Sequence, residues 1–182
     1  MNKKLTTRKM TAYALMSAAM CILGPMSIQI GPIPISFTNL VIYFAAYILG
    51  TKGVFWSYLV YYLLGAFGLP VFSGFSGGLS KLVGPTGGCL IGFFFTAVLS
   101  ALVIKKFPKN KLLQIIGIYA STFVTYLLAV LWFAFVQKTS LASAFAACVM
   151  PFLLIDLAKV IVSAFIAPVI SQRVKVNGDF YE

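Results

Sequence analysis

MTAYALMSAAMCILGPMSIQIGPIPISFTNLVIYFAAYILGT, residues 10–51, decides the fold, because these 42 consecutive residues include no charged side chain. Three further uncharged runs follow at 53–80, 82–104 and 112–137. A helix crosses the hydrocarbon core of a membrane with about 20 apolar residues, so each run is long enough for at least one crossing. The sequence therefore predicts an all-α integral membrane protein.

The overall composition favours the same class of protein. Of the 182 residues, 61% are apolar and 9% are charged, whereas a soluble domain has about 25% charged residues. The net charge of +11 would fit a nucleic-acid partner, but the basic residues lie between the apolar runs and not on one face. We therefore expect membrane lipid around the chain and no nucleic acid.

Metal and cofactor chemistry is not indicated by the residue types present. The chain has no histidine, and its three cysteines form no CxxC pair. Zinc and haem sites are therefore not expected, and the cysteines are interpreted as small buried side chains. No resident cofactor is predicted.

The first 23 residues imitate a secretory signal, with basic residues followed by an apolar stretch. The apolar run continues past the core of an ordinary signal. Met20 is also not the small residue that a lipoprotein cleavage site needs before Cys21. We interpret this segment as a retained first helix.

Proline, glycine and charged residues divide the chain into six predicted spans. The spans are 11–28, 36–49, 54–69, 89–104, 112–136 and 144–170. The segment GPIP at 31–34 separates the first two, because two prolines remove hydrogen-bond donors and fix φ. The second and third spans are short for a perpendicular crossing of the membrane.

Basic residues are unequally divided between the two sides that six spans would create. One side has only two, Lys81 and Lys138, and the other has 11. These 11 are Lys3, Lys4, Arg8, Lys9, Lys52, Lys105, Lys106, Lys109, Lys111, Arg173 and Lys175. Cytoplasmic loops are enriched in Lys and Arg. We therefore predict a six-transmembrane-helix bundle with N- and C-termini cytoplasmic, forming a single membrane-embedded domain over residues 1–182.

Two charged residues, Asp156 and Lys159, lie inside the last predicted span, PFLLIDLAKVIVSAFIAP. A charge at the centre of a membrane helix costs about 2.5–3.5 kcal/mol on insertion scales. At spacing i, i+3 the two side chains share one helix face. A structural ion pair within the bundle is one interpretation. A functional site is favoured, because ionisable groups inside membranes usually mark substrate or ion pathways.

The donors and acceptors of this pair indicate the kind of ligand. Asp156 offers acceptors and Lys159 offers donors, which suits a compact ligand with both N–H and C=O groups, such as a urea or an amide. Alternatively, Lys159 alone holds a carboxylate, or Asp156 carries a proton. The absence of histidine and of a second intramembrane acid makes a proton relay the weaker alternative.

The segment LPVFSGFSGGLSKLVGPTGG, residues 69–88, contains six glycines and two prolines. Irregular backbone at a membrane is tolerated where it is buried in protein or lines a cavity, so plain loop formation and a ligand cavity are both open. GGLSK lacks the Gly-Lys-Ser/Thr order of a phosphate-binding loop. We expect no ATPase site of the chain's own, and no enzyme, because histidine and paired carboxylates are absent.

A small-residue face occurs on the first predicted span, where Ala14 and Ala18 are four residues apart. Such spacing lets two helices approach closely. The spacing is equally compatible with packing inside this bundle and with docking to a partner protein.

Four segments resemble the BioY family, the biotin-binding S components of energy-coupling factor (ECF) transporters. They are GPIPISFTNL (31–40), LLGAFGLPVFSGFSGG (63–78), LVGPTGG (82–88) and DLAK (156–159). The order and spacing of the segments make the resemblance specific. It implies a subunit that captures biotin on the extracellular side and delivers it by toppling in the membrane. The implied partners are a transmembrane T component and two ATPases.

The resemblance also implies roles for individual residues. Asp156 and Lys159 would contact the ligand, whose ureido ring presents two N–H donors and one carbonyl. The further implied substrate-binding residues are Thr38, Asn39, Phe75, Gly77 and Thr86. The face of Ala14 and Ala18 would dock to the T component. Cys89 replaces the aromatic residue that usually follows GPTGG, so we expect stacking from Phe75 or Phe93 instead.

Two other functions stay open beside this one. The chain could be an S component for another vitamin, or a self-sufficient proton-coupled carrier that uses Asp156. An enzyme embedded in the membrane comes last, because suitable catalytic groups are missing.

Overall fold

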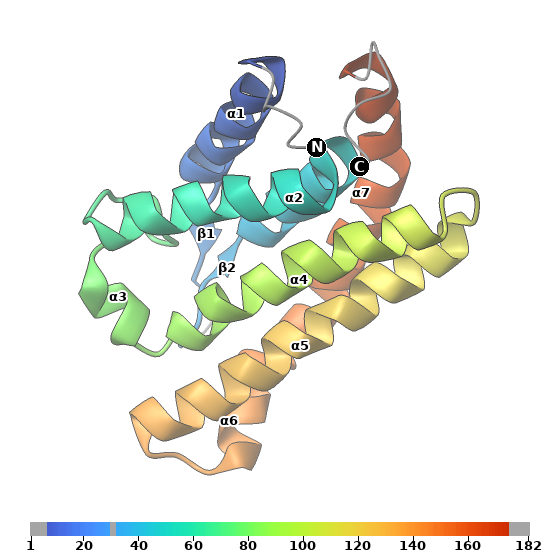
Figure 1. The fold of residues 1–182 in the computed structure, drawn as a ribbon. Coiled ribbons are helices and arrows are strands. Elements are labelled where there is room, and N and C mark those ends of the chain that lie inside the picture. Colours follow the sequence, from blue (N-terminus) through green and yellow to red (C-terminus); the bar gives the residue numbers. More distant parts are fainter. Residues whose placement is uncertain (1–6, 30–31, 175–182) are drawn as a thin grey trace.

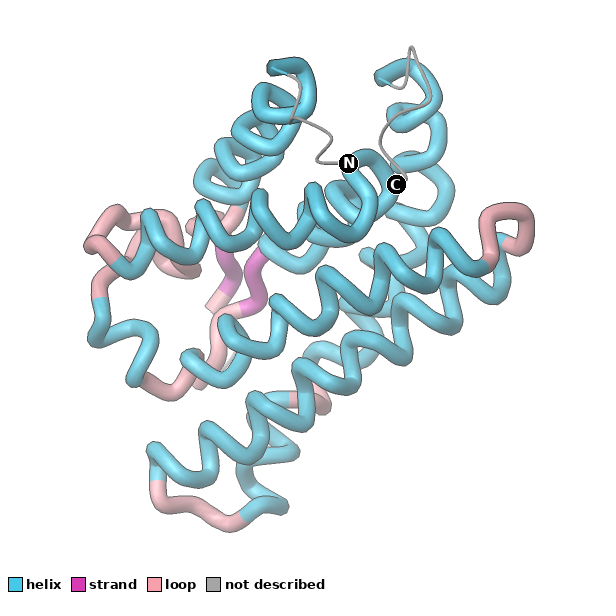
Figure 2. The backbone as a smooth tube through the Cα atoms, in the orientation of Figure 1, coloured by secondary structure: helices cyan, strands magenta, loops and turns pink. Residues whose placement is uncertain are grey.

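The computed structural model describes residues 7–29 and 32–174 as a bundle of helices joined at one place by a small β-hairpin (Figures 1 and 2). The elements are α1 (Thr7–Leu23), β1 (Ser27–Ile28), β2 (Ile35–Ser36), α2 (Thr38–Ala66), α3 (Leu79–Val83), α4 (Gly87–Lys106), α5 (Lys111–Gln137), α6 (Leu141–Cys148) and α7 (Phe152–Val174). Four stretches of the described residues are long and apolar enough to cross a membrane: Thr38–Ala66, Gly87–Lys106, Lys111–Gln137 and Leu141–Arg173. The predicted all-α membrane class is therefore confirmed as a helical bundle with four apolar stretches long enough to cross a membrane.

The helix α2 folds back on itself at Gly50. Gly50 has φ 67° and ψ −172°, a conformation that is essentially restricted to glycine. The hydroxyls of Thr38 and Tyr61 lie 3.5 Å apart although 23 residues separate them, whereas a straight helix would separate them by about 35 Å. The element therefore consists of two helical halves side by side, which correspond to the predicted spans 36–49 and 54–69 (Figure 1).

The predicted span 11–28 is too long at its C-terminal end. Helix α1 ends at Leu23 and is followed by Gly24 and Pro25, a pair that interrupts helices. Ser27 and Ile28 instead pair with Ser36 and Ile35 as an antiparallel hairpin that the sequence analysis did not predict. The short helix α3 inside the glycine-rich segment was also not predicted.

The predicted span 144–170 is interrupted. Helix α6 ends at Cys148 and α7 begins at Phe152. Pro151 lies in this break, has no N–H to donate, and disfavours helical backbone at Met150. The break sets α6 against α5 and gives α7 its own direction, so that Asp156 and Lys159 lie in its second and third turns.

Three buried tyrosines on α2 hold the centre of the bundle together. The hydroxyl of Tyr58 donates to the carbonyl oxygen of Leu90 at 2.8 Å, and that of Tyr61 donates to the carbonyl oxygen of Val71 at 3.1 Å. The Tyr43 hydroxyl lies 2.9 Å from the Thr122 hydroxyl on α5. The ring of each tyrosine thus packs in the apolar core while its hydroxyl forms a hydrogen bond, as is usual for buried tyrosine.

The two ends of the bundle differ in charge. The α4–α5 connection, the bend at Gly50, the beginning of α1 and the end of α7 lie toward the upper and right side of Figure 1, which we call the basic end. Its described basic residues are Arg8, Lys9, Lys52, Lys105, Lys106, Lys109, Lys111 and Arg173. The β-hairpin, α3 and the α5–α6 turn lie toward the other side, the hairpin end, where Lys81 and Lys138 are the described basic residues.

Candidate ligand-binding site

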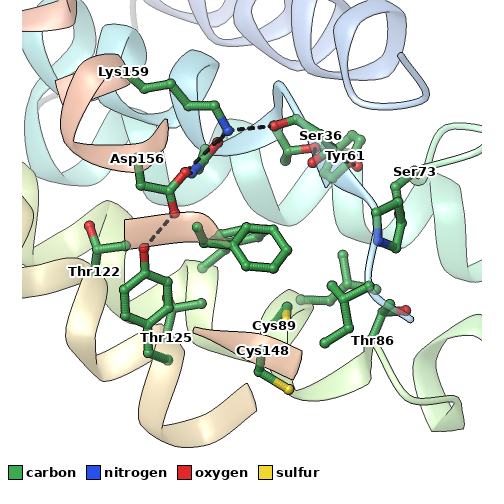
Figure 3. Close-up of a pocket in the computed structure, with 18 residues that line it drawn as sticks. Ser36, Tyr61, Ser73, Thr86, Cys89, Thr122, Thr125, Cys148, Asp156 and Lys159 are labelled. Atoms are coloured by element: carbon green, nitrogen blue, oxygen red, sulfur yellow. Dashed lines mark hydrogen bonds and ion pairs between the residues drawn. The ribbon is translucent and has the colours of Figure 1, made fainter. Parts of the chain in front are cut away.

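A cavity lies between β2, the start of α2, the start of α4, the middle of α5 and α7 (Figure 3). The space between its lining residues is about 640 Å³, which includes open solvent at its mouth. One wall is polar and contains Asn39, Tyr126, Asp156 and Lys159. The rest of the lining combines hydroxyl-bearing residues with the apolar side chains of Ile33, Leu90, Phe93 and Phe152. The cavity therefore suits a ligand with one polar and one apolar part.

Asp156 is the centre of the polar wall and is only 2% exposed. Its Oδ1 accepts hydrogen bonds from Asn39 Nδ2 at 2.7 Å and from Lys159 Nζ at 3.1 Å. Its Oδ2 accepts one from the Tyr126 hydroxyl at 2.8 Å. A buried charge is stable only when it is paired and hydrogen-bonded, and this carboxylate has both kinds of partner.

Lys159 connects α7 to the β-hairpin and to the start of α2. Besides Asp156, its Nζ donates to the carbonyl oxygen of Ser36 at 2.8 Å and to Asn39 Oδ1 at 2.9 Å (Figure 3). An ammonium group has three N–H donors, so all three are in use. Lys159 therefore reaches a ligand only by releasing one of these bonds.

Unused hydrogen-bonding capacity is found at Asp156 and Thr86. A carboxylate has about four lone-pair positions, and three are occupied at Asp156. The Thr86 hydroxyl is buried, and among the described residues it has no hydrogen-bond partner. A buried polar group without a partner costs about 1–3 kcal/mol. The cavity thus offers one acceptor and one hydroxyl to an incoming polar ligand.

The structure brings together five of the seven predicted substrate-binding residues. Thr38, Asn39, Thr86, Asp156 and Lys159 all line the cavity, and they come from α2, the α3–α4 connection and α7.

Phe75 and Gly77 do not line this cavity. Phe75 is 70% exposed and has a positive φ of 54°. Gly77 lies directly against the carbonyl oxygen of Leu69, where a β-carbon would collide with backbone. Phe93, one turn after Cys89, lines the cavity and is the aromatic residue closest in sequence to the replaced position.

Ala14 and Ala18 lie on the exposed face of α1. The neighbouring Ser17 faces the bundle instead, and its hydroxyl donates to the carbonyl oxygen of Ser57 at 2.9 Å. The small-residue face of Ala14 and Ala18 is thus not used for packing within the described part of the chain.

Tyr126 was missed in the sequence analysis, although it hydrogen-bonds directly to Asp156. A signal was present, because Tyr119, Thr122 and Tyr126 recur at i, i+3 and i+7 within an apolar run and share a helix face. The Ser36 carbonyl oxygen, by contrast, had no sequence signal, because any residue supplies a backbone acceptor.

The sequence matches the model of the BioY family over residues 1–176. The chain belongs to the BioY family. Among BioY relatives, the probable biotin transporter BioY of Pyrococcus horikoshii is 34% identical over 93% of this chain and 98% of its own length. The biotin transporter BioY of Thermotoga maritima is 34% identical over 88% of this chain and 94% of its own length.

The fold of this BioY chain is also similar to a crystal structure of the S-component for biotin from an ECF-type ABC transporter. The TM-score is 0.83 at 27% sequence identity, and the match covers 99% of this chain and 97% of that one. The all-helical arrangement of the bundle is therefore that of an ECF S component.

Proposed function

We propose that this chain is the biotin-binding subunit (S component) of an ECF-type vitamin uptake transporter and a multi-pass protein of the plasma membrane. The observation that carries the proposal is the buried Asp156 carboxylate, which faces the cavity with one acceptor position unused. The names of the relatives and of the similar crystal structure supply the identity of the vitamin.

The two walls of the cavity fit the two parts of biotin. A ureido N–H would donate to the remaining lone pair of Asp156. The Thr86 hydroxyl, on the opposite side of the cavity (Figure 3), would hydrogen-bond to a polar group at the other end of the ligand. The sulfur-containing ring and the alkyl chain would pack on Leu90, Phe93 and Phe152. Thr38 and Asn39 complete the polar wall in this proposal, whereas Phe75 and Gly77 act by shaping the glycine-rich loop at the hairpin end.

The proposed membrane arrangement has six crossings: α1, the two halves of α2, α4, α5, and α6 continued by α7. The basic end would face the cytoplasm with both termini, because cytoplasmic segments are enriched in Lys and Arg. The eight described basic residues at that end, against two at the hairpin end, support this orientation. The ligand cavity, beside the hairpin, would then open to the extracellular side.

The chain would work with partners and without a cofactor or an ATPase site of its own. We propose a transmembrane T component and two ATPases as the source of energy, with biotin as cargo. The exposed face of Ala14 and Ala18 is the proposed contact with the T component, because small side chains let two helices approach closely.

Calorimetric titration of the purified chain in a neutral detergent tests the vitamin. We expect tight binding of biotin and none of thiamine or riboflavin. Asp156→Asn should weaken biotin binding by about 10- to 100-fold, because a hydrogen bond to a charged group contributes about 1.5–3 kcal/mol. Asp179→Asn is the matched control. Binding no tighter than millimolar would overturn the proposal.

Vesicles that contain only this chain test the need for partners. We expect no biotin accumulation in response to a proton gradient, and accumulation only when the T component and ATPases are added. Accumulation by the chain alone, abolished by Asp156→Asn, would instead establish the proton-coupled carrier.

A further inference from the structure

A second cavity lies at the basic end, remote from the ligand site. It is bounded by the end of α4, the α4–α5 connection, the start of α5 and the end of α7, and encloses about 1000 Å³ including its opening. We call it the basic groove. Its mouth carries Lys105, Lys109 and Lys111, all exposed. None of the residues that line it belongs to the ligand cavity.

The floor of the basic groove is polar and buried, and its side chains are fixed by hydrogen bonds. Gln114, 4% exposed, accepts from the Tyr47 hydroxyl at 3.0 Å through Oε1 and donates to the carbonyl oxygen of Phe107 at 2.7 Å through Nε2. The Ser171 hydroxyl donates to the carbonyl oxygen of Tyr47 at 3.1 Å. The Nε2 atom of Gln114 has a second N–H, which makes the floor a potential donor to an anion.

The three lysines of the groove have no carboxylate partner among the described residues. Asp156 is the one acidic residue among the described residues, and it pairs with Lys159 in the ligand cavity. The first turn of α5 has no acidic residue and instead contains Lys111. The positive N-terminal end of the helix dipole repels a cation at this position. An anion would be stabilised both by the helix dipole and by the lysine charge.

Exposed apolar side chains occur close in sequence to residues that line the groove, and one of them contacts a groove lysine. Lys111 Nζ lies 4.9 Å from the centre of the Phe165 ring on α7. Leu112 and Ile116 on α5 and Val169 on α7 are exposed nearby in sequence. An anion bound at the groove would therefore have an apolar surface beside it. The acyl chains of a lipid can pack on such a surface, whereas a free inorganic anion cannot.

We propose that the basic groove binds the headgroup of an anionic phospholipid, whose phosphate is held by Lys105, Lys109 and Lys111 and whose acyl chains lie along α5 and α7. Basic pockets between membrane helices are suited to such headgroups. The bound lipid would join the end of α4 to the start of α5 and the end of α7. The site is separate from the biotin cavity and does not depend on the proposed vitamin.

Native mass spectrometry of the full chain, released from neutral detergent with added lipid, tests this site. Phosphatidylglycerol should bind at least ten-fold more tightly than phosphatidylcholine of the same acyl length. Lys105→Gln/Lys109→Gln/Lys111→Gln should lower phosphatidylglycerol affinity by about 100-fold, because each lysine near an anionic lipid contributes about 1 kcal/mol, or about five-fold. Inorganic phosphate at the same concentration should not displace the lipid.

Lys52→Gln/Lys106→Gln/Lys138→Gln is the matched control, because it removes the same charge from exposed lysines outside the groove. It should retain phosphatidylglycerol binding within about three-fold. Equal losses in the two triple variants would overturn the proposal, and so would displacement by phosphate, which would indicate a site for a free anion. Thermal unfolding of both variants verifies that they are folded, independently of biotin.

Discussion

Lysine has opposite surroundings in the two cavities of this molecule. In the ligand cavity, Lys159 is buried and donates all three of its hydrogens to protein acceptors. In the basic groove, Lys105 and Lys109 are exposed and have no carboxylate partner among the described residues. The same side chain thus fixes a rigid polar wall in one place and creates an attractive field for anions in the other.

This difference determines how each cavity selects its ligand. The ligand cavity selects by hydrogen bonds, because its charges cancel within the Asp156–Lys159 pair and only one acceptor position remains. The basic groove selects by charge, because three like charges surround a neutral floor. Substitutions should therefore have large and specific effects in the first cavity and small, additive effects in the second.

The largest expected effect is that of Asp156→Ala on stability. It leaves the Lys159 charge buried without a carboxylate, which costs about 3–5 kcal/mol. Lys105→Ala, in the groove, should change the unfolding free energy by no more than about 0.5 kcal/mol. Denaturant titration in detergent, followed by circular dichroism, measures both. Similar losses in the two variants would abolish the distinction between the cavities.

Tyr126→Phe should lower the free energy of unfolding by about 1.5–3 kcal/mol, because the Tyr126 hydroxyl donates to a charged carboxylate. Tyr119→Phe is the matched control on the same helix, since its hydroxyl donates to the neutral carbonyl of Leu153. Its cost should be about 0.5–1.5 kcal/mol. An equal cost for both tyrosines would contradict the central place of Asp156 in the polar wall.

Gly50→Ala tests the bend that places the two halves of α2 side by side. Alanine is strained at φ 67° and ψ −172°, so the variant should lose about 1–3 kcal/mol of stability. Thr51→Ala, one residue further, should lose no more than about 0.5 kcal/mol. Thermal unfolding in detergent compares the two. A stable Gly50→Ala variant would indicate that the halves of α2 are not held in this bend.

The smallest expected effect is that of Thr86→Val, which should lower biotin affinity without lowering stability. Thr86→Val removes a buried hydroxyl that has no protein partner among the described residues, so the unfolding free energy should stay the same or rise. Biotin affinity should fall by about two- to ten-fold, the value of one neutral hydrogen bond. Thr139→Val, on an exposed turn, is the control for calorimetry. Unchanged affinity would remove Thr86 from the binding site.

The charged residues of the ligand cavity were predictable from sequence because membranes penalise them. An acid and a lysine three residues apart in an apolar run have few explanations, and both line the cavity. The paired spans 36–49 and 54–69 were predictable from Gly50 and the charged turn that follows it. Their close contact through Thr38 and Tyr61 was not, because it depends on how the halves pack.

Features that depend on tertiary contacts were not predictable. The hairpin of β1 and β2 forms in a segment that reads only as a proline-rich connection, and Pro151 divides a run that was interpreted as one span. Phe75 and Gly77 matched a family pattern, but neither of them lines the cavity. Ser36 contributes a backbone carbonyl, which has no signature in any sequence.

The central claim is that the Asp156 wall of the cavity binds biotin, and the ligand that the protein retains tests it most directly. Mass spectrometry of small molecules released by denaturing the chain, purified from cells grown with biotin, should find biotin at close to one per chain. Asp156→Asn, purified in parallel, should retain little or none. A folded wild-type protein that carries no biotin, or a variant that retains it equally, would contradict this account.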